Sequence, residues 1–81
     1  MKVLIYSYDS TLIVDFLSLP PKPEAVLYLL HRGFREVRER VYIRAIPSLH
    51  ERRRIGYRIA LRLRRMGYEA ICRITARNNN G

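Results

Sequence analysis

Arginine side chains recur at helical spacing between residues 49 and 66, on the side of the expected helix that faces away from the core. The arginines on this side are Arg53, Arg54, Arg58, Arg62, Arg64 and Arg65. Tyr57 and Leu61, four residues apart, lie among them and point the same way. Guanidinium groups neutralise phosphates, and a tyrosine ring is a surface on which a base stacks. This combination predicts a surface that binds single-stranded nucleic acid.

The segment of residues 34–46 carries the same residue types at strand spacing, since polar and apolar residues alternate along it. We predict one long strand here. The side that we expect to face the core is formed by Val37, Val41, Ile43 and Ala45. The opposite side carries Arg38, Arg40, Tyr42 and Arg44, and other strands would add Tyr6, Tyr8, Arg73 and Arg77. We expect an open basic sheet surface, and the sequence leaves open whether it converges with the helix surface.

Together the two stripes define the predicted nucleic-acid-binding residues, with the arginines on phosphates and the two tyrosines on bases. They are Arg38, Arg40, Tyr42, Arg44, Arg53, Arg54, Tyr57, Arg58, Leu61, Arg62 and Arg65. Each stripe also has a purely structural explanation. The helix side would be a solvated face whose Tyr57 and Leu61 form a subunit contact, and the strand side would be an edge strand that charge protects from aggregation.

The charge of the chain supports a polyanionic partner. The 16 Lys and Arg residues against 7 Asp and Glu residues give a net charge of +9, and all 14 arginines lie within residues 32–81. A self-repelling basic surface of this kind is typical of nucleic-acid-binding proteins. Arginine also offers a bidentate fork and a flat face that lysine lacks.

Other chemistry has weaker support in the sequence. Asp9 and Asp15, near the first turn, are a weak candidate pair of ligands for a divalent metal, as in a small nuclease. The single cysteine, Cys72, alternates with apolar residues and is expected to be buried. We therefore predict a non-enzymatic protein without catalytic residues, metal ligands or cofactors, which binds single strands of DNA or RNA with little sequence specificity. The alternatives are a double-stranded DNA architectural protein, a basic protein-interaction module and a small metal-dependent nuclease.

The elements that must position these residues follow from local patterns. We predict strands over residues 2–8, 11–17, 34–46 and 68–77, and helices over residues 24–32 and 49–66. The core side of the second helix is expected to be Ile55, Ile59, Leu63 and Met66, with Gly56 and Ala60 alongside. The predicted fold class is α+β, a two-layer sandwich with a four-stranded sheet, two helices on one face and the order ββαβαβ. One domain would cover residues 1–77, and residues 78–81 would be a frayed tail.

No apolar run approaches the roughly 20 residues of a membrane span, and the first residues lack a secretory signal pattern. We therefore expect a cytoplasmic protein that has no membrane partner and is associated with the nucleoid. A domain of 81 residues buries only about 60 to 65 % of its unfolded surface, which favours self-association into a homodimer.

The arginine-rich helix that starts Glu51-Arg52-Arg53-Arg54-Ile55-Gly56-Tyr57-Arg58, the compact α+β order and the composition resemble one known family. Gln is absent and Asn occurs only at residues 78–80, which is typical of thermophiles. The chain resembles the small archaeal single-stranded DNA-binding proteins of the ThermoDBP type and their shorter relatives. The resemblance implies a cleft of basic and apolar residues that binds single strands, and assembly into a dimer.

Overall fold

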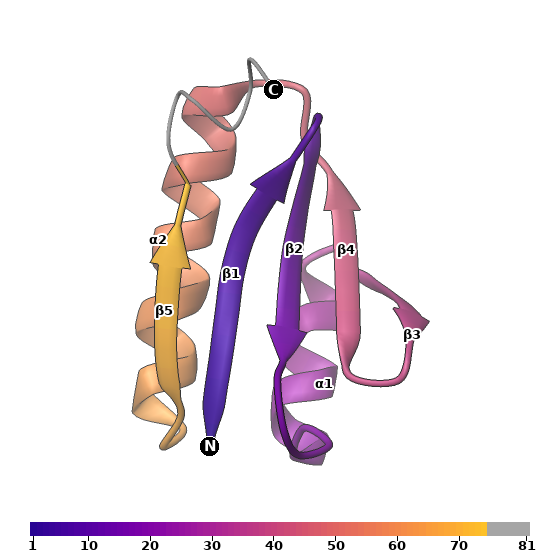
Figure 1. Cartoon of the computed structure of the whole chain (residues 1–81), viewed down its shortest axis with the longest axis vertical. Helices are drawn as coiled ribbons and strands as arrows, with labels where there is room; N and C mark the ends of the chain where they lie inside the picture. The colour runs from indigo at the N-terminus through magenta and orange to yellow at the C-terminus, as the bar shows by residue number, and fades with distance from the viewer. Residues whose placement is uncertain (75–81) are drawn as a thin grey trace.

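The computed structural model of the chain describes residues 1–74 and has an α+β fold (Figure 1). The elements in chain order are β1 (Lys2–Tyr8), β2 (Thr11–Phe16), α1 (Pro23–His31), β3 (Arg35–Arg38), β4 (Val41–Ala45), α2 (Leu49–Arg65) and β5 (Glu69–Arg73). The predicted α+β class is confirmed. The predicted frayed tail and Arg77 lie outside the described residues.

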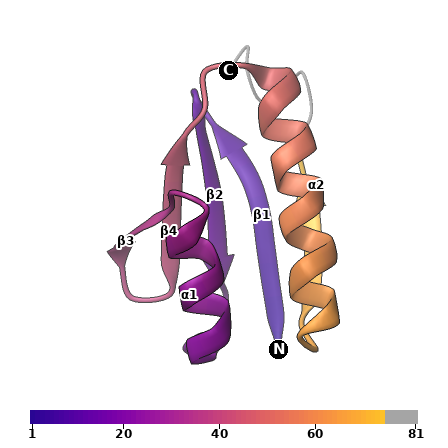
Figure 2. The ribbon, with the colours of Figure 1, turned by 180° about the vertical axis from the view of Figure 1, so that it is seen from behind.

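The five strands form one mixed sheet in the order β3-β4-β2-β1-β5. Neighbouring strands are antiparallel except β1 and β5, which pair in parallel. Both helices lie on the same side of this sheet, α2 over β1 and β5 and α1 over β2 and β4 (Figures 1 and 2). The other face of the sheet carries neither helix.

The predicted four-stranded sheet and the order ββαβαβ are wrong, because the segment of residues 34–46 forms two strands instead of one. β3 and β4 are an antiparallel hairpin, and Arg40 in the turn between them has a φ of 71°. Left-handed backbone at a hairpin turn is usually supplied by Gly, Asn or Asp, and this turn has Glu39-Arg40 instead. The sequence therefore carried no compositional sign of the turn, and the order is ββαββαβ.

The predicted orientation of the second half of this segment is also wrong. Tyr42 pairs with Val14, which faces the helices, whereas Ile43 pairs with Ile13 on the uncovered face. Tyr42 is only 3 % exposed, and its ring lies edge-on to Phe16 with the ring centroids 6.0 Å apart. Burial, together with the carboxylate of Glu36, raises the pKa of the Tyr42 phenol. Alternation defines two sides of a strand but does not say which one the helices cover.

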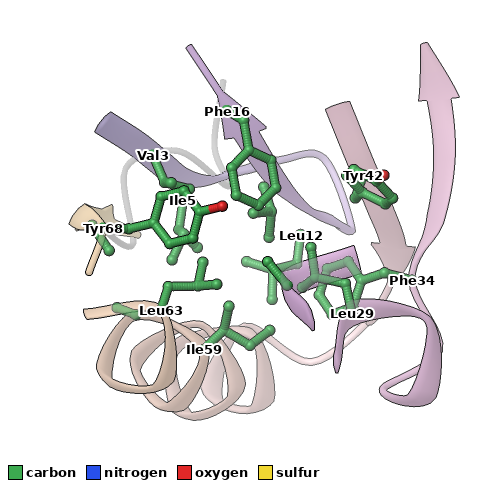
Figure 3. Packing of buried hydrophobic residues seen from close by; sticks show 14 of the residues in the cluster. Val3, Ile5, Leu12, Phe16, Leu29, Phe34, Tyr42, Ile59, Leu63 and Tyr68 are labelled. Atoms are coloured by element: carbon green, nitrogen blue, oxygen red, sulfur yellow. The ribbon is translucent and has the colours of Figure 1, made fainter. Parts of the chain in front are cut away.

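The four residues predicted to face the core, Val37, Val41, Ile43 and Ala45, are accordingly exposed or half-buried. The core lies between the sheet and both helices (Figure 3). Phe16 is at its centre, because its ring packs against Tyr68 as well as Tyr42, at a centroid distance of 5.3 Å from Tyr68. The hydroxyl of Tyr68 accepts a hydrogen bond of 2.8 Å from the backbone N–H of Lys22. This aromatic group therefore connects the sheet to the segment that leads into α1.

Helix α2 begins and packs as its sequence predicts. Ser48 is the N-cap, and its Oγ accepts a hydrogen bond of 3.2 Å from the backbone N–H of Glu51. The predicted core side is confirmed: its members are buried or packed against the core, namely Ile55, Gly56, Ile59, Ala60, Leu63 and Met66. Arg52 shares this side, is only 1 % exposed, and was not recognised from the sequence. Its Nη1 donates to the carbonyl oxygens of Ile46 at 2.6 Å and Pro47 at 2.9 Å.

Replacing Arg52 is expected to destabilise the protein because the two carbonyls of the β4–α2 connection lose a charged donor. For Arg52→Met we expect a loss of about 2 to 4 kcal/mol in the free energy of unfolding. The matched control is Arg53→Met at the next residue, which is exposed. It should change the free energy of unfolding by less than about 0.5 kcal/mol. Urea denaturation of both variants measures this difference. Equal stabilities would contradict a stabilising role for the hydrogen bonds from Arg52 to the β4–α2 connection.

Candidate functional site

A groove runs between α1 and α2 on the outer side of the helix layer. It consists of three hollows of about 200, 490 and 220 Å³, and all three are lined by Tyr28 and Arg32. Since they share these residues, we treat them as one groove. The arginines that line it are Arg32, Arg44, Arg54, Arg58, Arg62 and Arg65. We call this surface the basic groove.

Helix α2 supplies most of the positive charge. Arg54, Arg58, Arg62 and Arg65 follow one another at intervals of three or four residues, so they lie on one side of the helix. This side is adjacent to the buried side of α2, and the apolar parts of Ile55 and Ile59 form part of the floor. From Arg54 to Met66 the groove follows α2 over roughly 18 Å.

Tyr28 of α1 lies at the point where all three hollows meet. The guanidinium carbon of Arg32 is 5.4 Å from the centroid of the Tyr28 ring, and that of Arg62 is 5.3 Å from it. Cation–π contacts of this length contribute about 0.5 to 1 kcal/mol each at exposed sites. Tyr28 therefore holds guanidiniums from both helices beside the groove and keeps them close to each other despite their repulsion.

Arg44 reaches the groove from the sheet. Its Nη1 donates a hydrogen bond of 2.9 Å to the carbonyl oxygen of Arg32, which ends α1. Gly33 follows this contact in a left-handed conformation that favours glycine, with a φ of +88°. Arg44 was predicted on the open sheet face, and this is wrong: it pairs with Leu12 on the helix side of the sheet. At the end of a strand a long arginine stem can pass the edge of the core and reach solvent.

The groove is strongly electropositive. Against its six arginines stand Glu24, which lines one end, and Glu51, which binds the Arg54 side chain with a shortest N–O distance of 2.6 Å. Hydrogen bonding to Arg54 lowers the pKa of Glu51, and the same contact raises the pKa of Arg54. The arrangement favours a ligand with several negative charges in a row.

The structure brings some of the predicted binding residues together and separates others. Of the predicted binding residues, six line the basic groove, namely Arg44, Arg54, Arg58, Leu61, Arg62 and Arg65. Tyr57 is 58 % exposed on α2 and lies on the same side as Leu61, four residues away. Arg53 is exposed on α2 outside the three hollows, and Arg38 and Arg40 belong to the β3–β4 hairpin. Tyr42 lies in the core, so it has no free ring face for a base.

Sequence reasoning missed two residues at the centre of the groove, Tyr28 and Arg32. A positive residue at the C-terminus of a helix complements the helix dipole, so Arg32 at the end of α1 gives no sign of a binding role by its position alone. Their spacing in the sequence could have indicated a shared surface, because an aromatic residue and an arginine four positions apart lie on one side of a helix. The distance between the two helices, by contrast, is not encoded in either of them.

The residues considered for other chemistry do not form a site. Asp9 is in the turn before β2 and Asp15 is near the other end of β2, more than about 13 Å away along the strand. Within residues 1–74 no group of three or more His, Cys, Asp or Glu side chains could hold a metal ion. Burial raises the pKa of the Cys72 thiol, although Arg64 opposes the effect, so the thiol is a poor nucleophile near neutral pH. In this same part of the chain, neither helix has the length and apolarity needed to cross a bilayer.

Comparisons with protein-family models, with curated proteins and with solved structures found no match to this chain. The basic groove, with six arginines from both helices and β4, is the largest concentration of like charge among the hollows described above.

Proposed function

We propose that this protein binds single-stranded DNA or RNA in the basic groove, without catalysing a reaction and with little sequence specificity. The observation that carries the proposal is the convergence of six arginines from α1, β4 and α2 around Tyr28. Guanidinium groups bind phosphate oxygens through paired hydrogen bonds. A concave groove between two helices suits one flexible backbone, whereas a duplex is better matched by an element that enters one of its grooves.

Contacts to bases would come from the outer side of α2. Tyr57 and Leu61 are 58 % and 39 % exposed, so both side chains are available for contact with a ligand. Both lie next to the arginines of the groove. A strand whose phosphates lie along the arginines can therefore place a base on the Tyr57 ring.

Replacing Tyr57 tests this base contact. Tyr57→Ala is expected to weaken the binding of a single strand by about 1 to 3 kcal/mol, because one stacking contact is lost. The slope of log K against log salt should not change, because the number of neutralised phosphates stays the same. Tyr57→Phe keeps the ring and should bind as the wild type does. Equal affinities of Tyr57→Ala and wild type would remove Tyr57 from the site.

The proposed function is tested by fluorescence anisotropy with labelled single-stranded DNA, single-stranded RNA and duplex DNA of equal length, each at several salt concentrations. We expect tighter binding of the single strands than of the duplex, with part of the affinity kept at high salt. Equal binding of all three that disappears with salt would mean that the net charge of +9 acts without a stacking site, and would favour the double-stranded DNA architectural protein or the basic protein-interaction module. Binding of none would favour the protein-interaction module.

We propose in addition, independently of strand binding, that the protein is a homodimer, and that it acts in the cytoplasm close to the nucleoid. Support for self-association comes from the small size of the domain and from the sheet face that no helix covers.

A further inference from the structure

The uncovered face of the sheet is mostly apolar in its centre, where Asp15 on the central strand β2 is the charged residue. The strand register places two neighbouring rows of side chains there. One row is Val41, Asp15, Leu4 and Ile71, and the next is Ile43, Ile13, Tyr6 and Arg73. The six apolar members of these rows are half-buried, and no element of residues 1–74 lies over them.

A sheet with one face in water normally alternates apolar residues toward the core and polar residues toward solvent. This sheet does not, since its β1, β2 and β4 are apolar on both sides near their middle. Within residues 1–74, the arginines on the uncovered side of the strands lie on the two edge strands, as Arg35 and Arg38 on β3 and Arg73 on β5. A mostly apolar centre with a charged rim is the organisation of a protein–protein interface.

We propose that a second copy of this chain covers this face, so that the two sheets pack against each other. A sheet of five strands spaced about 4.8 Å apart, with between five and six residues per strand on average, presents roughly 24 by 18 Å, so two copies would bury roughly 860 Å² in total, the size of a small interface. The face is also suited to a copy of itself in charge, because it contains a carboxylate, Asp15, and arginines at its rim.

Nucleic acid fits this face less well than a second copy does. Five of the six apolar residues in the two rows are aliphatic, whereas sheets that bind single strands present aromatic rings for stacking. Asp15 lies between Leu4 and Val41 in the middle of the face, where it would repel phosphates. The aromatic residues on this side of the sheet are Tyr6 in the rows and Tyr8 at the end of β1.

The arrangement has a functional consequence. With sheets inside and helices outside, the dimer has four layers, and its two basic grooves lie on opposite outer surfaces. Each groove would hold its own strand, so the dimer would bridge two strands or two segments of one strand. Bridging rests on the proposed function, whereas the dimer does not.

Light scattering of the full chain without nucleic acid tests the dimer. One chain has a mass of 9.6 kDa, and we expect the wild type to have twice this mass. We expect Ile13→Glu to have the mass of one chain, because the new carboxylate would be buried at the centre of the interface. Ile43→Thr keeps a residue that favours strands and should weaken the dimer at least roughly tenfold without unfolding, as checked by circular dichroism. The matched control is Leu30→Glu on α1, 47 % exposed, which should remain dimeric.

A monomeric wild type at micromolar concentrations would overturn the proposal. So would a dimer that survives both sheet variants, or one that Leu30→Glu dissociates, since the contact would then lie elsewhere.

Bridging is measured by energy transfer between donor-labelled and acceptor-labelled single strands mixed with the protein. Transfer is expected with the wild type and should disappear with Ile13→Glu, although this variant still binds each strand alone. If the folded Ile13→Glu variant loses strand binding itself, nucleic acid occupies the sheet face and the proposal is wrong. If the wild type is a dimer that binds no strand, the proposed function fails while the dimer stands.

Discussion

Single-stranded DNA is expected to bind roughly 100-fold more weakly, or worse, to the variant Arg58→Glu/Arg62→Glu than to the wild type at about 0.1 M salt. Both arginines line the basic groove, and Arg62 lies against Tyr28. The substitution removes two phosphate contacts and puts two carboxylates in their place, where they repel the strand. Anisotropy titrations over a range of salt should also show the slope of log K against log salt reduced by about 1.4 on a single strand.

The matched control is Arg38→Glu/Arg40→Glu, which changes the net charge of the protein by the same amount. These two arginines belong to the β3–β4 hairpin and do not line the three hollows of the basic groove. We expect only a small loss of affinity, from the weaker long-range attraction, and an unchanged salt slope. If both double variants lost the same affinity, the overall charge would explain binding and the groove would not.

Replacing Phe16 by alanine is expected to cost about 3 to 5 kcal/mol of the free energy of unfolding. The ring is 1 % exposed and packs edge-on against Tyr42 and Tyr68, so its removal leaves a cavity at the centre of the core. For a domain of this size the whole stability is about 4 to 12 kcal/mol. The melting temperature should therefore fall by roughly 15 to 30 °C.

Thermal and urea denaturation at one fixed protein concentration measure this loss, since self-association would add to stability at higher concentration. The adjacent Leu17, 46 % exposed, provides the control: Leu17→Ala should cost less than about 1 kcal/mol. A loss below about 1 kcal/mol for Phe16→Ala would mean that the aromatic group is not the centre of the core.

Interactions between residues close in the chain determined what the sequence could predict. The hairpin of β1 and β2 follows from two apolar runs around Asp9-Ser10, and Asp9 has the left-handed backbone, with φ of 56°, that such a turn uses. Helix α2 begins at the Ser48 cap and ends before Gly67, whose φ is +98°. Its helical period also separated the buried side from the arginine side.

Only the tertiary structure decided which surfaces these elements share. Alternation between residues 34 and 46 is the same for either orientation of the strand, and the aromatic contact of Tyr42 with Phe16 selects the one observed. The turn at Arg40 has no turn-forming residue, and the carbonyl oxygen of Arg40 accepts a hydrogen bond of 2.9 Å from the backbone N–H of Phe16 at the end of β2. Tyr28 and Arg32 join the arginines of α2 because the sheet places two helices from distant parts of the chain side by side. A single sequence records the periodicity of each element, whereas the groove exists only in the space between two of them.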